Sequence, residues 1–211
     1  TWRSEFGFSF GQAGVVLGAG LVGFFWAIPI MGVVIEAINY KFGVIVALIC
    51  HVVSAYMVWI AADVYAGQNT EAVFQHLYWS MFIFAFANGT WEAVMNPAVA
   101  AQVSDEKQIG KWMCWLHMGW PAGLILGGLS LNLPFEWKVT LVLYLIPVAI
   151  YTFLSIGRKI EGSTATKSKV SIWTMLGQIF RPTVLLILAL QLGVGFTEFS
   201  CSQYISTFLT K

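Results

Sequence analysis

The stretch NGTWEAVMNPAVAAQVSDEKQIGKWMCWLHMGWPAGLILGG, residues 88–128, contains the pattern that decides the fold. Its first apolar run has one carboxylate, Glu92, with Asn88 and Asn96 four residues to either side. On a helix this spacing places the three polar side chains on one face. After a charged turn, a second apolar run contains a single histidine, His117. A carboxylate deep in an apolar membrane helix is costly, so the pattern predicts a functional site.

The composition of the whole chain indicates a membrane protein. Of its 211 residues, 58% are hydrophobic and 10% are charged, and the mean hydropathy is +0.76. Soluble domains contain about 25% charged residues, and one of this length could not bury so much apolar surface. The net charge of +1 excludes the basic profile of a nucleic-acid-binding protein. The three cysteines follow no zinc or disulfide spacing and are interpreted as packing residues.

Long apolar runs predict an all-α, polytopic membrane bundle with six transmembrane helices. The first run alone is long enough to cross a hydrocarbon core of about 30 Å. The predicted spans cover residues 10–35, 42–62, 74–102, 112–133, 139–156 and 183–209. Residues 172–180 predict a short amphipathic helix at the membrane surface. In the fourth span, glycines at every fourth position predict a close helix contact at Gly123.

Basic residues are divided unequally between the two sets of predicted loops. Lys and Arg concentrate in cytoplasmic loops, so the richer side should be cytoplasmic. That side has Lys41, Lys107, Lys111, Arg158, Lys159, Lys167, Lys169 and Arg181, whereas the other side has Arg3, Lys138 and Lys211. With six spans, both ends of the chain are expected on the outer side of a plasma (inner) membrane. The polar segment 158–171 is expected inside as a flexible linker.

Three further polar residues lie within predicted spans. Gln191 and Glu198 share one face of the last span, and Glu198 is a second carboxylate near mid-membrane. His51 lies in the middle of the second span. We interpret it as a packed or hydrogen-bonded residue rather than a proton relay.

These residues resemble the major facilitator superfamily of secondary transporters. Residues 92–97, followed by His117 and its glycine row, are similar to the fucose–proton-symporter-like sugar permeases, as is Glu198 before residues 204–209. A turn that includes Gly32, Glu36 and Lys41 resembles a degenerate form of the signature that the family has between its second and third helices. Here Ala37 replaces the usual basic residue and Asn39 stands near the position of the usual glycine.

The resemblance implies that the chain is a fragment covering helices two to seven of a twelve-helix fold. Residues 1–157 would form most of the N-terminal half, residues 158–182 a cytoplasmic linker, and residues 183–211 the first helix of the C-terminal half. In that fold the solute binds at mid-membrane, between halves that rock around it. The turn at Gly32, Glu36 and Lys41 would then belong to the gating machinery.

The function that this implies is proton-coupled symport of a small polar solute, a sugar or sugar derivative, through the lipid bilayer. Glu92 is the predicted coupling residue, with a proton or sodium as the coupling ion. Amides bond sugar hydroxyls and aromatic rings stack on sugars. The predicted solute-binding residues are Asn88, Asn96, His117, Gln191 and Glu198. No cofactor, metal or catalytic residue is predicted.

Two other functions and several structural roles stay open. A drug or metabolite exporter could share the fold, although the amides favour a polar solute. An integral-membrane enzyme would need clustered metal ligands or a Ser–His pair, and His51, His76 and His117 fall in different spans. Glu92 could simply bond a neighbouring helix, and His117 could be a packing residue. The aromatic residues Trp112, Trp115 and Trp120 could be interfacial or core residues.

Overall fold

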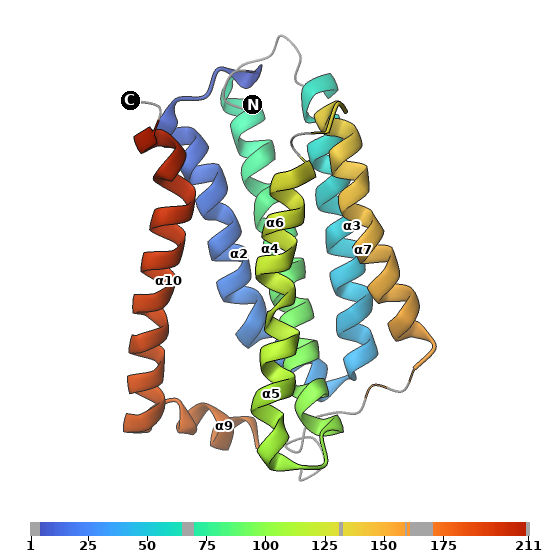
Figure 1. The fold of residues 1–211 in the computed structure, drawn as a ribbon, viewed down its shortest axis with the longest axis vertical. Helices are drawn as coiled ribbons and strands as arrows, with labels where there is room; N and C mark the ends of the chain where they lie inside the picture. Colours follow the sequence, from blue (N-terminus) through green and yellow to red (C-terminus); the bar gives the residue numbers. More distant parts are fainter. Residues whose placement is uncertain (1–4, 65–69, 131–132, 159, 161–170, 210–211) are drawn as a thin grey trace. The chain divides into compact units, whose positions relative to one another are not determined.

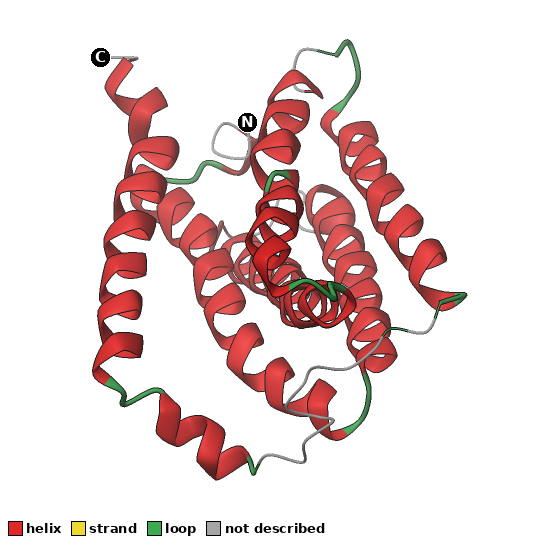
Figure 2. Ribbon diagram, turned by 60° about the horizontal axis from the view of Figure 1, so that its bottom comes forward, coloured by secondary structure: helices red, strands yellow, loops and turns green. Residues whose placement is uncertain are grey.

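The computed structural model describes residues 5–64, 70–130, 133–158, 160 and 171–209. The chain divides into two compact units, Thr1–Lys167 and Ser168–Lys211. Throughout the described ranges the regular structure is helical, with loops between helices and no strand (Figures 1 and 2). The all-α prediction is therefore confirmed.

The helices follow the predicted spans closely, with two exceptions in the middle of the chain. In the first unit they are α2 (Phe10–Ala37), α3 (Tyr40–Val64), α4 (Thr70–Gln102), α5 (Glu106–His117), α6 (Gly119–Ser130) and α7 (Trp137–Ile156). The second unit has the short helix α9 (Ile172–Gln178), which confirms the predicted helix there, and the long helix α10 (Pro182–Leu209).

Short polar side chains define where three of these helices begin. Ser9 and Gln12 form a reciprocal capping box at the start of α2. The Asn39 carboxamide oxygen accepts a hydrogen bond of 2.8 Å from the Phe42 amide at the start of α3. Asp105 caps α5 in the same way, through the Lys107 amide. Residues 106–111, predicted as a charged turn, are therefore the first turns of a helix.

The predicted fourth span, residues 112–133, is wrong as a single helix. The structure has two helices of 12 residues each, α5 and α6, which meet at Met118. The physical reason is Pro121, which has no amide hydrogen to donate to the carbonyl of His117. The break lies between His117 and Gly119, and both of these residues line a pocket of the first unit.

Close helix packing occurs between α2 and α4, not at the predicted glycine row. A Cβ atom built on Gly23 of α2 would lie 2.2 Å from the Phe82 carbonyl oxygen of α4. A Cβ atom on Gly89 of α4 would lie 2.7 Å from the Ala27 Cβ of α2. At Gly123 no described atom lies within 4 Å of such a Cβ. The prediction that Gly123 marks a close contact is therefore wrong within the described part of the chain.

Helices α3 and α7 complete the first unit on the other side of α4. α3 packs on α4, and α7 packs on α3. Lys138 at the start of α7 forms an ion pair of 2.8 Å with Asp63 near the end of α3. At the opposite ends, the Lys41 ammonium group donates to the Ile156 carbonyl over 3.2 Å. The antiparallel helices α3 and α7 are thus connected by a polar contact at each end.

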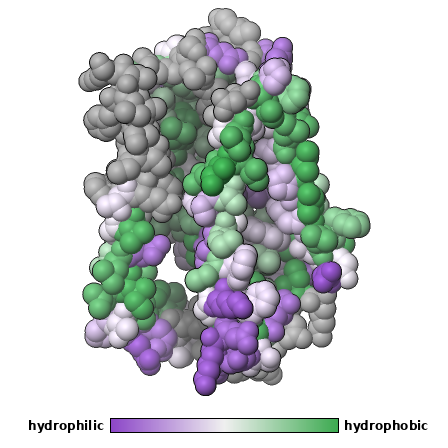
Figure 3. Space-filling view, viewed as in Figure 1, coloured by the Kyte–Doolittle hydropathy of each residue, from purple (hydrophilic) through white to green (hydrophobic). Residues whose placement is uncertain are grey.

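The outside of the helices is apolar. Three described helices are long and apolar enough to span a membrane: residues Phe10–Ala37, Tyr40–Ala61 and Trp137–Ile156. Hydrophobic side chains cover the visible sides of α6 and α7, while hydrophilic ones gather around the start of α5 (Figure 3). Such an exterior fits a lipid environment, with charged residues kept to the ends of the helices.

Candidate functional site

A pocket of about 280 Å³ opens on the polar face of α4. It brings together Asn88, Glu92 and Asn96, as the spacing of four predicts. The break between α5 and α6 adds His117 to the same pocket. The remaining lining residues are largely apolar or aromatic: Phe24, Trp91, Met95, Leu116, Gly119 and Trp120. Four of the predicted site residues are therefore neighbours in space.

Glu92 shares the pocket with amides rather than with cations. The Asn96 amide nitrogen donates to a Glu92 carboxylate oxygen over 3.4 Å. The carboxamide oxygen of Asn96 is buried and has no hydrogen-bond partner among the described residues. No Lys or Arg occurs among the described residues that line the pocket. An amide of this kind can donate to an ionised carboxylate or, after turning over, accept from a protonated one.

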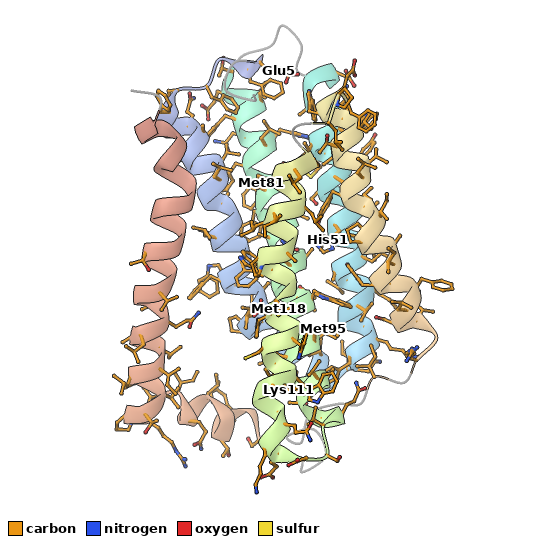
Figure 4. All side chains as sticks on the ribbon, viewed as in Figure 1. Glu5, His51, Met81, Met95, Lys111 and Met118 are labelled. Carbon is orange, nitrogen blue, oxygen red and sulfur yellow. The ribbon has the colours of Figure 1, made fainter. Side chains whose placement is uncertain are left out.

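His51 lies near the middle of α3 (Figure 4) and contacts Asn88 of α4. Its Nε2 atom is 2.9 Å from the Asn88 carboxamide oxygen, and its Nδ1 atom is 2.8 Å from the Tyr151 hydroxyl of α7. The His51 side chain is only 3% exposed and lies edge-on to the rings of Phe84 and Tyr144. The prediction that His51 is a hydrogen-bonded residue is confirmed, but its link to the pocket was missed.

An aromatic contact joins the same group to the wall of the pocket. The ring centroids of Trp91 and Tyr151 are 4.0 Å apart, with an angle of 33° between the planes. Tyr151 thus contacts His51 through its hydroxyl group and Trp91 through its ring. Trp91, Phe24 and Trp120 give the pocket three aromatic side chains beside the polar ones. A solute with both hydroxyl groups and apolar ring faces matches this lining.

The other predicted site residues lie elsewhere. Gln191 and Glu198 belong to α10 in the second unit, where Gln191 is exposed and the side chain of Glu198 lies outside the described residues. Lys41 lies at the start of α3, and Glu36 near the end of α2 accepts a hydrogen bond from the Tyr40 hydroxyl. Gly32 has no described atom within 4 Å of a built Cβ.

Two other cavities of the first unit contain none of the predicted site residues, although Gln102, Asp105 and Gln108 give the first of them a polar lining. One of about 380 Å³ surrounds the turn between α4 and α5, at the ends of these helices. Another of about 330 Å³ between α3, α4 and α7 is apolar apart from hydroxyl groups. In the described ranges, no group of three or more His, Cys, Asp or Glu side chains is placed to hold a metal ion.

Comparison with known proteins gives one match. The family model described as Major Facilitator Superfamily matches residues 1–211. No curated protein and no solved structure matches the chain.

Proposed function

The chain belongs to the major facilitator superfamily of membrane transporters, and from this premise we propose that it moves a sugar or sugar derivative by proton-coupled symport. The observation that supports this proposal is the pocket on α4. It combines two asparagines, a carboxylate and a histidine with three aromatic side chains. Its volume of about 280 Å³ is just below the ~300–1,000 Å³ found for small-molecule sites. A monosaccharide is a solute of suitable size and chemistry.

In this proposal Glu92 exchanges the coupling proton. The carboxylate is half-buried, faces the pocket, and contacts an amide that can bond either protonation state. No Lys or Arg among the described lining residues neutralises the carboxylate, so it is available to take up a proton that accompanies the solute. Gln191 and Glu198 of α10 would complete the site from the second half of the transporter. The two halves, joined through residues 158–182, would rock around the solute.

The proposed function predicts concentrative sugar uptake. Proteoliposomes containing the transporter would be given tritiated L-fucose, D-galactose, D-glucose and N-acetyl-D-glucosamine, with and without an inward proton gradient. At least one sugar should accumulate only when the gradient is present, and a protonophore should abolish the accumulation. Uptake driven equally well by a sodium gradient would instead identify sodium as the coupling ion. Absence of uptake for all four sugars would contradict the sugar assignment.

The aromatic wall gives a second prediction. Replacing Trp120 by Ala removes a ring that lines the pocket, and should weaken sugar affinity by about two- to twelvefold, since an aromatic contact contributes ~0.5–1.5 kcal/mol. Trp115 provides the control, because it is exposed in the same segment but does not line the pocket. Equilibrium binding to both alanine variants measures the difference. Equal affinity of the two variants would argue against stacking at Trp120.

The orientation that we propose places the start of α5 in the cytoplasm. At that end of the first unit lie Lys41, Lys107, Lys111 and Arg158, whereas Lys138 lies at the other end and is paired with Asp63. In a variant without native cysteines, an impermeant maleimide should label Glu136→Cys in intact cells. It should label Gln108→Cys only after permeabilisation. Labelling of both positions in intact cells would contradict this topology.

A further inference from the structure

We infer that His51 is a positioning residue that fixes which way the Asn88 amide faces, so that the pocket presents hydrogen-bond donors to the solute. The inference rests on the proposed function for its solute, but its geometry lies entirely in the first unit. The group consists of Tyr151, His51 and Asn88, one residue each from α7, α3 and α4. Only Asn88 lines the pocket.

The direction of the hydrogen bonds follows from the chemistry of the partners. The carboxamide oxygen of Asn88 can only accept, so the Nε2 atom of His51, 2.9 Å away, must be the donor. In the neutral imidazole the other nitrogen then has no hydrogen and can only accept. The Tyr151 hydroxyl, 2.8 Å from Nδ1, is placed to donate to it. With the Asn88 oxygen facing His51, the tautomer with hydrogen on Nε2 is the one that satisfies both neighbours.

This arrangement leaves one set of donors available. With its oxygen engaged by His51, the Asn88 amide nitrogen has two hydrogens and no hydrogen-bond partner among the described residues. Asn88 is half-buried and lines the pocket. The amide nitrogen can therefore donate to an acceptor on the solute, such as a hydroxyl or ring oxygen. If His51 had its hydrogen on Nδ1, the amide would turn over and the pocket would present an acceptor there instead.

The surroundings of His51 favour a fixed geometry over a mobile one. The imidazole is 3% exposed and its ring centroid lies within 6.0 Å of those of Phe84, Tyr144 and Tyr151. A buried polar side chain without its partners would be costly, so both hydrogen bonds are strongly retained. Tyr151 also packs on Trp91 of the pocket wall. The group thus fixes the positions of two lining residues, Asn88 and Trp91, relative to each other.

Two substitutions of similar polarity separate positioning from packing. In His51→Gln the terminal amide nitrogen occupies roughly the place of Nε2 and can still donate to Asn88. In His51→Asn the shorter side chain reaches roughly the place of Nδ1, so the contact with Asn88 is lost. We expect the Asn variant to bind about tenfold more weakly, from the loss of one directed hydrogen bond, and the Gln variant to bind within about twofold of wild type.

The probe for this comparison is the tightest-binding of L-fucose, D-galactose, D-glucose and N-acetyl-D-glucosamine. Ser54→Ala is the matched control, since Ser54 is buried one turn along α3 and its hydroxyl bonds only the His51 carbonyl oxygen. It should leave affinity unchanged. Equal affinity of the Gln and Asn variants would overturn the positioning role.

A second measurement needs no solute. The chain has 3 histidines, so ¹⁵N-histidine labelling of the transporter in nanodiscs gives few signals, and His76→Gln and His117→Gln identify the signal from His51 by elimination. We expect the tautomer with hydrogen on Nε2. Hydrogen on Nδ1, or on both nitrogens, would overturn the inference even if neither variant folds. If none of the four sugars binds wild type, the sugar proposal fails, while the tautomer still decides the arrangement around His51.

Discussion

Replacing Glu92 by Gln is expected to abolish proton-driven accumulation of the solute while leaving solute exchange intact. An inward gradient of one pH unit corresponds to about 1.4 kcal/mol, which supports about tenfold accumulation if one proton moves with each solute. Wild-type proteoliposomes should approach this ratio. The Gln variant should stop at an internal to external ratio of about 1, because it has no group at position 92 that can release a proton.

The structure explains why exchange should survive. Gln keeps a carbonyl oxygen at the end of the side chain, so the Asn96 amide can still donate to it across the 3.4 Å contact. The variant thus imitates the protonated acid in shape and hydrogen bonding. Counterflow of labelled against unlabelled sugar measures exchange, and the accumulation ratio under a proton gradient measures coupling.

A matched control uses a carboxylate outside the pocket. Glu106 lies exposed in the first turn of α5, and Glu106→Gln should change neither measurement. Accumulation retained by Glu92→Gln would contradict the coupling role. Loss of folded protein in that variant would instead support the structural alternative, in which Glu92 only stabilises the packing of α4.

The polar face of α4 was predictable from the sequence because it depends on local geometry alone. Helical spacing places Asn88, Glu92 and Asn96 together whatever surrounds them. The structure adds the walls: Phe24 comes from α2, and His117 comes from the end of α5. A predicted span can give the face of a helix but not the residues opposite it.

The connection between His51 and Asn88 shows this limit. The two residues are 37 positions apart on different helices, and Tyr151 is 100 positions from His51. No periodicity within one helix relates them, so the sequence predicts only a packed or hydrogen-bonded role for a single histidine in an apolar run. Ser54 is also a polar residue in the same apolar helix, yet its hydroxyl donates to the His51 carbonyl oxygen within that helix.

The break at Met118 does not follow from the sequence alone. Pro121 leaves the His117 carbonyl without its usual donor, but whether one helix or two results depends on whether neighbouring groups compensate. In the structure, Met118 still donates to the Cys114 carbonyl and Ala122 donates to that of Met118. The chain thus continues in nearly the same direction after a local interruption, which no span prediction distinguishes from a straight helix.

Replacing Gly23 by Ala is expected to impair folding more than any other single methyl group added at a described glycine. The new Cβ would lie 2.2 Å from the Phe82 carbonyl oxygen, which is a backbone atom of α4. A backbone atom cannot move aside as a flexible side chain can, so α2 and α4 must separate. Overpacking of this kind typically costs about 1–3 kcal/mol. The expected result is a lower melting temperature in detergent and a lower yield of monodisperse protein.

Two other glycines of α2 serve as controls for Gly23→Ala. At Gly18 and at Gly32, both on α2, no described atom lies within 4 Å of a built Cβ. Alanine has the higher helix propensity, by about 1 kcal/mol, so Gly18→Ala and Gly32→Ala should leave the melting temperature unchanged or raise it. If alanine were favoured equally at every helix position, all three variants would melt at or above the wild-type temperature. We expect Gly23→Ala to melt below it. A Gly23→Ala variant as stable as these two would show that α2 and α4 do not approach as closely as the structure has them. Since α4 forms the polar wall of the pocket, the same variant should also weaken sugar binding whenever enough folded protein remains to measure it.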